Sequence, residues 1–294
     1  MNMLANINGR ILPLAQANIP ITDHGLLYGY GLFITVRAYK GHLFLIDDHL
    51  QKLRIGLQEL GIELAGGVKR LELEMKATLK ANQMRNGAVR LTITAGDNGW
   101  MKSNKPYSNP SFIIFTRKLS SRSDSPNKVV TVLNTPFYAP KVAYKTLSRL
   151  AFMLGKKEQR SKKANEGLFL TENGAVAEGI SSNIFIVRRR ALITPPASIG
   201  IIPGVTRRFV MALAQKNGYE VKEQLLNLKD LANVDEVFLT NATQQICPVI
   251  RIDDMIRLNA GPITAHLQQQ YQLYTSSLRS TDKLSYNQNG KELQ

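Results

Sequence analysis

Three groups of residues near the middle of the chain could act together on one organic ligand. Lys145 supplies an amine, Glu178 follows 178 − 145 = 33 residues later in EGISSNIF, and the run GIIPGVTRR occupies residues 200–208. A lysine amine can form a Schiff base with a carbonyl, and a buried carboxylate can keep a heteroaromatic nitrogen protonated. Pro203 and Gly204 are typical of the opening turn of a helix, whose free N–H groups bind phosphate.

One cofactor has an aldehyde, a ring nitrogen and a phosphate ester, and that cofactor is pyridoxal 5'-phosphate. The sequence therefore predicts that Lys145 binds its aldehyde and that Glu178 pairs with its ring nitrogen. The phosphate is expected at the N–H groups of Val205 and Thr206 and at the Thr206 hydroxyl. A lysine on a charged chain is ordinarily a solvated side chain, and Lys141 lies only four positions before Lys145.

Five motifs in order resemble those of the fold-type IV pyridoxal-phosphate enzymes, the class IV aminotransferase family. This family includes branched-chain aminotransferases, D-amino-acid aminotransferases and 4-amino-4-deoxychorismate lyases. The resemblance spans almost the whole chain and implies a two-domain fold and a homodimer. The matching runs are DHGLLYGYGLFITVR at 23–37, DDHLQKL at 47–53, KTLSRLA at 145–151, the block 167–208, and LTNATQQICPV at 239–249.

The resemblance also assigns roles to individual residues. It implies that Lys145 carries the Schiff base and that Ala242 and Thr243 form a second phosphate-binding loop. Lys52 stands where the family pattern HxxRL has arginine, so a point charge replaces a planar fork and phosphate orientation is expected to be looser. The alternatives are that Lys52 points to solvent and that Glu178 is a surface residue in a β-turn.

Departures from the aminotransferase pattern favour the lyase branch. Aminotransferases of the family carry glutamate at position 34, where this chain has Ile34, which cannot exchange protons. KTLSRL and the TNA at 240–242 resemble the lyase versions of those motifs. We therefore expect a 4-amino-4-deoxychorismate lyase that releases pyruvate and 4-aminobenzoate, a folate precursor, with Lys145 as base and Thr35 or a water as acid. The alternatives are a branched-chain or D-amino-acid aminotransferase, or a basic binding protein on an inactive scaffold.

A substrate with two carboxylates needs cationic groups facing the cofactor. The candidates are Arg37 and Arg149, although Arg37 could also cap a strand edge and Arg149 could lie on a helix surface. Tyr28 and Tyr30 are predicted to line the cofactor mouth, with core or dimer packing as the alternative.

Composition narrows the class of protein. The chain has 294 residues, 44% of them hydrophobic, and a net charge of +16 (38 − 22). The basic residues form short scattered clusters without interleaved aromatics, so we expect solvated faces rather than a nucleic-acid surface. The single cysteine, Cys247, predicts a buried side chain, with neither a disulfide nor a metal site. No run approaches the roughly 20 apolar residues of a membrane span, which predicts a soluble, cytoplasmic protein without membrane contact.

The pattern of elements predicts a mixed α/β and α+β fold in two domains. Residues 1–117 are expected to form a small α/β domain with β-hairpins around Asn8-Gly9 and Lys40-Gly41. Residues 118–128, KLSSRSDSPNK, are expected to form a linker. Residues 129–279, rich in short strands, are expected to form a larger, barrel-like β domain with flanking helices that binds the cofactor. Asp47 is predicted to cap a helix that ends at Gly61. A final helix is expected near residues 263–278, followed by a frayed polar tail at 280–294.

Overall fold

The computed structural model describes residues 3–100, 106–119, 127–137, 142 and 144–285. These residues pack as two compact units. The first comprises Met1–Arg122, Tyr144–Arg149 and Thr275–Ser280, and the second comprises Ser123–Ala143, Leu150–Tyr274 and Thr281–Gln294. The first unit thus includes two short segments that lie far along the chain from its main part. Most of the predicted linker lies outside the described residues.

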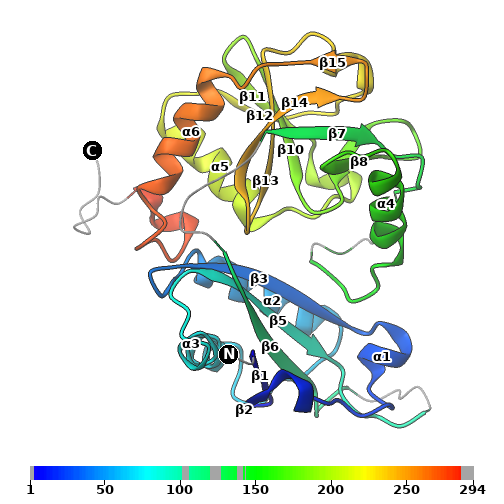
Figure 1. Cartoon of the computed structure of the whole chain (residues 1–294), viewed down its shortest axis with the longest axis vertical. Coiled ribbons are helices and arrows are strands. Elements are labelled where there is room, and N and C mark those ends of the chain that lie inside the picture. The colour runs from blue at the N-terminus through cyan, green and yellow to red at the C-terminus, as the bar shows by residue number, and fades with distance from the viewer. Residues whose placement is uncertain (1–2, 101–105, 120–126, 138–141, 143, 286–294) are drawn as a thin grey trace. The chain divides into compact units, whose positions relative to one another are not determined.

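The first unit is built on an antiparallel sheet of six strands in the order β2-β1-β6-β5-β3-β4 (Figure 1). The predicted hairpin around Asn8 and Gly9 is present, because both residues have positive φ and join the first two strands. The hairpin around Lys40 and Gly41 is also present. The strands are β1 (Leu4–Ile7), β2 (Arg10–Pro13), β3 (Gly31–Tyr39), β4 (His42–Leu43), β5 (Gly87–Thr94) and β6 (Ser111–Lys118).

Helices cover one face of this sheet. Side chains at alternate positions of β3 are almost fully buried, among them Leu32 and Val36. A Cβ added at Gly56 would lie 3.0 Å from the Leu32 side chain, so this face of β3 packs directly against the helix that contains Gly56. The helices of the unit are α1 (His24–Tyr28), α2 (Ile46–Glu59) and α3 (Lys69–Ala81), with the short 3-10 turn η1 (Leu14–Gln16).

The segment Thr275–Ser280 is fastened to the start of α2 by an arginine that bridges two carboxylates. The Arg279 side chain donates to both carboxylate oxygens of Asp47, at 3.1 and 2.7 Å, and to both of Glu72, at 2.8 and 2.7 Å. The prediction that Asp47 caps the helix is wrong, because Leu45 occupies the cap position with φ 54°. Asp47 instead lies in the first turn, where a carboxylate is favoured by the helix dipole.

The second unit contains a nine-stranded mixed sheet in the order β12-β11-β10-β13-β14-β7-β8-β9, with β15 paired to β14. The pairings β11–β12, β14–β7 and β7–β8 are parallel, and the others are antiparallel. The strands are β7 (Lys128–Val132), β8 (Glu166–Leu170), β9 (Val176–Gly179), β10 (Asn183–Arg188), β11 (Ala191–Thr194), β12 (Val221–Glu223), β13 (Glu236–Asn241), β14 (Gln245–Ile252) and β15 (Ile256–Arg257).

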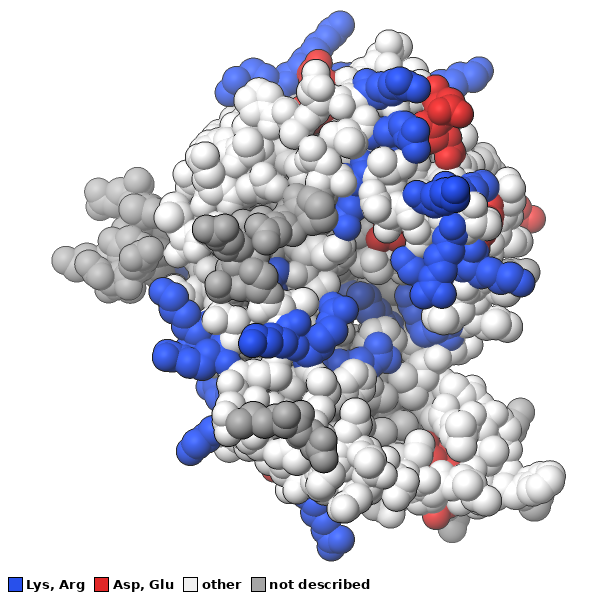
Figure 2. Space-filling model, in the orientation of Figure 1, with Lys and Arg blue, Asp and Glu red and all other residues white. Residues whose placement is uncertain are grey.

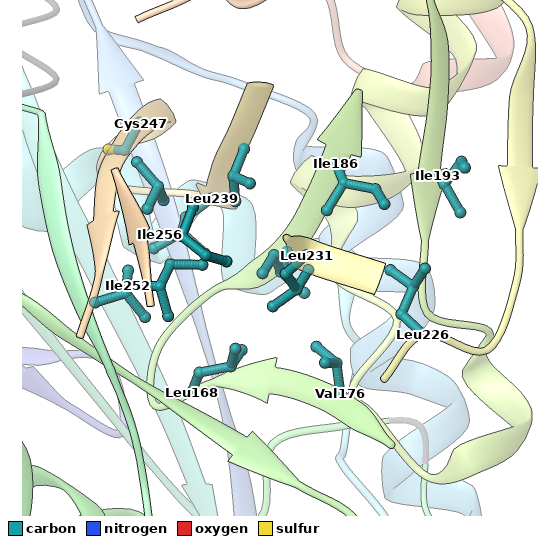
Figure 3. Packing of buried hydrophobic residues seen from close by; sticks show 14 residues of the cluster. Leu168, Val176, Ile186, Ile193, Leu226, Leu231, Leu239, Cys247, Ile252 and Ile256 are labelled. Atoms are coloured by element: carbon teal, nitrogen blue, oxygen red, sulfur yellow. The ribbon is translucent and has the colours of Figure 1, made fainter. Parts of the chain in front are cut away.

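One apolar cluster forms the centre of this sheet. It draws buried side chains from eight of the nine strands, including Leu168, Val176, Ile186 and Ile252 (Figure 3). Strands that are distant in sheet order can share one cluster only if the sheet curls around it. The curled sheet therefore confirms the predicted mixed fold with a barrel-like β domain.

Helices pack outside this curled sheet. Contacts join α5 to β13 and α6 to β14, and α5 and α6 also contact each other. The helix α4 was not predicted, because its buried face consists only of Phe152, Gly155 and Gln159. The helical elements are α4 (Leu150–Ser161), α5 (Val205–Lys216), α6 (Pro262–Gln272), η2 (Ala197–Ile199), η3 (Leu228–Leu231) and η4 (Thr281–Ser285).

The C-terminal part differs from the sequence-based prediction. The last long helix ends at Gln272 and not near residue 278. The expectation of a frayed tail is wrong at its beginning, since the Ser280 hydroxyl donates to Asp48 at 2.7 Å and η4 packs on α5. Residues 286–294 of the predicted tail lie outside the described residues.

The Arg279 bridge should make a measurable contribution to stability. Arg279→Gln is expected to lower the free energy of unfolding by about 2 kcal/mol, because hydrogen bonds between charged groups are lost and partial exposure limits each of them. Hydrogen bonds from Arg279 lower the pKa of Glu72 from 4.5 to about 2. This contribution is therefore present above pH 4.5 and is lost as the pH falls towards 2.

Chemical denaturation between pH 2 and 7 measures the effect, with Arg208→Gln as the matched control. Arg208 pairs with Asp282, and both side chains are largely exposed, so the control should change stability by no more than about 0.5 kcal/mol. Equal losses in the two variants, or parallel pH curves for Arg279→Gln and the parent, would contradict the assigned role.

Candidate active site

Lys145 is held beside β3 by backbone hydrogen bonds. The Phe33 N–H donates to the Lys145 carbonyl at 2.9 Å, and the Leu147 N–H donates to the Gly31 carbonyl at 3.0 Å. A short antiparallel bridge between Leu32 and Thr146 lies between these bonds. This stretch therefore adds to the free side of the first residues of β3, and the position of Lys145 is set by the central sheet of the first unit. Lys141 lies outside the described residues.

Lys145 and Lys52 both act on one buried histidine, His49. His49 and Lys52 are one helical turn apart on α2, and His49 is buried. Burial, together with the charges of Lys52 and then Lys145, lowers the pKa of His49 to about 3. Both lysines therefore act electrostatically on this imidazole, which stays neutral above about pH 3. This juxtaposition of Lys52 and Lys145 in the first unit fits a site for an anionic cofactor.

The face of the sheet opposite α2 carries arginines around one aromatic ring. The Arg90 guanidinium lies 3.6 Å from the centre of the Phe33 ring, and that of Arg149 lies 6.0 Å from it. Thr35 is directly opposite Arg90 in the pairing of β3 with β5, so the two side chains share this face. Arg37, two residues after Thr35, is on the same face with its guanidinium 4.9 Å from the Tyr39 ring centre.

Arg90 is a residue that the sequence reasoning missed. Partial burial lowers the pKa of its guanidinium below the ordinary value, because the charged form loses part of its hydration. The available signal was the alternation of AVRLTITA, in which a single arginine interrupts an otherwise apolar and hydroxyl-bearing strand.

The structure changes the interpretation of Ile34. Its partner across the sheet is Leu91, whose own partner on β6 is Ile114, and all three side chains are buried on the helix-facing side. Position 34 therefore points away from Thr35 and Arg90. Proton-transfer chemistry cannot be inferred from the absence of a carboxylate there, because the residue belongs to the core.

Tyr28 and Tyr30 are tied to neighbouring loops by their hydroxyls. The Tyr28 hydroxyl donates to the Trp100 carbonyl at 2.6 Å, and the Tyr30 hydroxyl donates to the Leu60 carbonyl at 2.9 Å. The centre of the Tyr30 ring lies 5.1 Å from that of Tyr107. This contact favours the alternative that Tyr30 packs in the protein rather than lining the cofactor mouth. Tyr28, which is 42% exposed, keeps a surface open to a ligand or a second chain.

In the second unit Glu178 is buried in a strand. Its side chain lies on β9 with 4% exposure, so the alternative of a surface glutamate in a turn is wrong. The Oε2 atom accepts hydrogen bonds from the Asn183 side-chain amide at 3.3 Å and from the Ile202 N–H at 3.2 Å. Donors of this kind favour the ionised carboxylate, which is the form that can hold a proton on a ring nitrogen.

The predicted phosphate helix is α5, and it begins where the sequence suggested. Gly204 is the N-cap in extended conformation, and no side chain caps the helix. The first N–H groups of a helix have no partner within it, so those of Val205 and Thr206 point to the same end as the positive end of the helix dipole. Arg207, which was expected on a solvated face, is buried and bonds to Glu223 at 2.6 Å.

The second predicted phosphate loop follows β13. Asn241 Oδ1 accepts from the N–H and hydroxyl of Thr243, both at 3.0 Å, and from the Gln244 N–H at 2.8 Å. The loop is therefore folded around Asn241, and the Thr243 donors are directed to that side chain. This geometry leaves Ala242, at the tip of the turn, as the more suitable of the two predicted residues.

Thr240 is a further residue that the sequence reasoning did not assign. It pairs with Asn183 across β13 and β10, so its side chain shares a face with the residue that contacts Gly204. Its hydroxyl is buried, and within the described part of the chain it has no hydrogen-bond partner. A buried hydroxyl in this state is costly unless a ligand bonds to it.

These features fit pyridoxal 5'-phosphate. The uncapped end of α5 and the orphaned Thr240 hydroxyl suit its phosphate, and the buried Glu178 carboxylate suits its ring nitrogen. In the first unit Lys145 suits its aldehyde, and Lys52 adds a positive charge. Sets of three metal-ligating side chains do not occur among the described residues.

Comparison with known proteins identifies the family. The model of the family described as amino-transferase class IV matches residues 31–252. The chain belongs to this family. The aminodeoxychorismate lyase of Bacillus subtilis (strain 168) is 35% identical over 272 residues, covering 90% of this chain and 92% of the relative. The D-alanine aminotransferase of Bacillus licheniformis is 29% identical, covering 90% and 94%.

A solved structure leads to the same family. The crystal structure of the branched-chain amino acid aminotransferase of Escherichia coli superposes with a TM-score of 0.86 at 27% identity, covering 97% of this chain and 98% of that chain. Enzymes of the family use pyridoxal phosphate. The predictions of fold, family and cofactor are confirmed, and the protein is a pyridoxal-phosphate enzyme.

The chain is strongly basic, with 38 Lys and Arg residues against 22 Asp and Glu. Figure 2 shows lysine and arginine side chains in several separate groups on the face in view, with few acidic ones. The group at Lys156–Lys163 lies on α4 and the turn after it, where Lys157 and Arg160 are exposed. A search of the described helices for one long and apolar enough to cross a membrane finds none.

Lys145 should be the residue that holds the cofactor covalently. Borohydride reduction of the purified protein is expected to attach the cofactor to Lys145, as read by peptide mass mapping, because this amine is fixed at β3 beside a second cation. In Lys52→Ala the attachment site should be unchanged, while cofactor affinity falls by roughly 1.5–3 kcal/mol through the loss of a charged hydrogen bond. An adduct on Lys141, or unchanged affinity in Lys52→Ala, would rule these roles out.

Proposed function

We propose that the protein is a pyridoxal-phosphate-dependent 4-amino-4-deoxychorismate lyase, which releases pyruvate and 4-aminobenzoate in folate precursor synthesis. The observation that carries the proposal is the arginine-bearing face around Phe33 and Thr35. A substrate with two carboxylates is recognised by such a face, because guanidinium groups bind carboxylates through two parallel hydrogen bonds. The 35% identity to a lyase supports the same reaction.

The proposed residues have different roles in the reaction. The cofactor, when bound, supplies an electron sink next to the bonds that change. Lys145 removes the proton from C4 of the substrate, and the Thr35 hydroxyl or a water molecule protonates the departing enol, which becomes pyruvate. Glu178 keeps the proton on the ring nitrogen. The six-membered ring of the substrate becomes aromatic as the C–O bond to the enol breaks, which drives the reaction forward.

Arg90 and Arg149 would hold the substrate carboxylates. Both guanidinium groups approach the Phe33 ring, which constrains the direction in which they lie. Arg90 also donates to Thr92 at 3.2 Å, which orients it on the strand. Arg37 is buried against Tyr39 and is a weaker candidate than the sequence suggested.

An aminotransferase is the second candidate. It is favoured by the D-alanine aminotransferase at 29% identity and by the fold match to a branched-chain aminotransferase. Ile34 no longer argues against it, because that side chain lies in the core. The distinction then rests on Thr35 and the arginines, and on whether a keto acid is needed.

The proposed assembly is a cytoplasmic homodimer. Large apolar side chains around α1 are exposed, with Ile21 at 81%, Leu26 at 61% and Trp100 at 85%. Exposed apolar patches of this kind mark interaction surfaces. We expect light scattering to give twice the mass of one chain, and Trp100→Glu to shift the mass towards one chain. Leu73→Glu, on α3 at 69% exposure, is the control, and a single-chain mass for the parent protein would refute the dimer.

Product analysis tests the proposed reaction directly. Purified protein with the cofactor and aminodeoxychorismate should release pyruvate and 4-aminobenzoate in equal amounts without a keto acid, since the lyase restores its cofactor in each cycle. Thr35→Val, which keeps the shape of the side chain, should slow release roughly a hundredfold if the hydroxyl carries the proton. Amino transfer from a branched-chain or D-amino acid to 2-oxoglutarate, with no pyruvate from aminodeoxychorismate, would replace this assignment by the aminotransferase one.

A further inference from the structure

Asn183 forms hydrogen bonds through both its amide nitrogen and its amide oxygen, and these bonds reach two parts of the candidate site. Its amide nitrogen donates to Glu178 Oε2 at 3.3 Å and to the Ile202 carbonyl at 2.9 Å. Its amide oxygen accepts from the Gly204 N–H at 3.3 Å. The side chain is 5% exposed, so these bonds are shielded from water and their geometry is fixed by the surrounding packing.

The two parts joined in this way have different tasks. Glu178 lies on β9 at the end that would meet the ring nitrogen, and Gly204 is the N-cap of α5, where the phosphate would bind. Asn183 itself is the first residue of β10 and pairs with Thr240, directly before the second predicted phosphate loop. A single side chain on a central strand thus touches the ring end and the phosphate end together.

We infer that Asn183 is a positioning residue that sets the distance between the ring-nitrogen carboxylate and the phosphate-binding end of α5. Because its planar amide contacts Glu178 and Gly204 at once, a shift of one is transmitted to the other. The inference rests on the roles proposed for Glu178 and α5 and is independent of whether the enzyme is a lyase or an aminotransferase.

The close approach at Gly204 offers a specific probe of this coupling. A Cβ added at Gly204 would lie 2.4 Å from Asn183 Oδ1, closer than atoms can approach. The φ of Gly204 is −60°, so alanine is acceptable to the backbone, and the cost arises from contact with Asn183. Gly204→Ala should therefore displace the Asn183 side chain and disturb Glu178, although Gly204 belongs to the phosphate end.

The experiment uses the full-length protein stripped of its cofactor and three probes. Dissociation constants are measured for pyridoxal 5'-phosphate, for pyridoxal, which lacks the phosphate, and for inorganic phosphate. Asn183→Ala should raise the dissociation constants of pyridoxal and of inorganic phosphate by about tenfold each. This is the size of effect expected when one buried hydrogen bond is lost at each end. The matched control is Asn217→Ala, whose amide bonds to the Leu213 carbonyl at the other end of α5; it should leave all three constants unchanged.

A double-mutant cycle separates positioning from general damage. Gly204→Ala should raise the dissociation constant of pyridoxal severalfold in the parent protein. The increase should be much smaller in the Asn183→Ala background, because the obstructing amide oxygen is absent there. This arm remains informative if Asn183→Ala alone binds poorly or unfolds, because Gly204→Ala by itself must already weaken pyridoxal. The inference is overturned if Asn183→Ala affects only one of the two partial ligands, or if Gly204→Ala has the same effect in both backgrounds.

These outcomes are distinct from those of the reaction assignment. Product analysis can favour an aminotransferase while the binding constants still support Asn183, since no turnover is measured. Conversely, unchanged pyridoxal binding in Asn183→Ala would refute the positioning role and leave the lyase proposal intact.

Discussion

The hydrogen bonding of the buried Glu178 carboxylate is the interaction on which the rest of the candidate site depends. An ionised carboxylate with 4% exposure is costly unless it accepts hydrogen bonds, and Glu178 Oε2 accepts them from the Asn183 amide and the Ile202 N–H. These same groups lead into the start of α5. Hydrogen bonds to this one carboxylate and to Asn183 therefore hold β9, β10 and the start of α5 in a fixed arrangement.

The first unit gathers positive charges, whereas the second unit buries a negative one. Lys52 and Lys145 bring positive charge to a buried imidazole that stays neutral, and Arg90 places a further guanidinium beside Phe33. Positive charges gathered in this way are stabilised when an anionic ligand is bound. A phosphorylated cofactor and a dicarboxylate substrate would supply that negative charge. The lysines and arginines of this unit are therefore consistent with the proposed chemistry.

The sequence predicted the elements whose signals are local. The hairpins at Asn8-Gly9 and Lys40-Gly41 and the start of α5 were found because turn and cap residues specify them directly. The strand that carries Glu178 was missed, since VAEG ends in glycine and contains a charge, and only the packing of the sheet explains why it is buried. The helix α4 was missed for a similar reason, because it lacks the broad apolar face that identifies a helix in a sequence.

Longer-range features required the structure. The partnership of Arg279 with Asp47 and Glu72 spans over 200 residues, and no local pattern reports it. The pairing of Lys145 with β3 has the same character. For Ile34 the residue type was read correctly but its face was not, because a strand buried on both sides, as β3 is, shows no polar alternation. The family resemblance supplied the residue roles that the physical pattern alone left open.

The central claim is that a buried, ionised Glu178 keeps a proton on the ring nitrogen of the cofactor. The most direct measurement is the ¹⁵N chemical shift of isotopically labelled pyridoxal 5'-phosphate bound to the parent and to Glu178→Gln, recorded across the pH range in which both are folded. The account predicts a protonated nitrogen throughout in the parent, and loss of that proton at a markedly lower pH in the variant. An unprotonated nitrogen in the parent at neutral pH, or identical titrations in the two proteins, would contradict it.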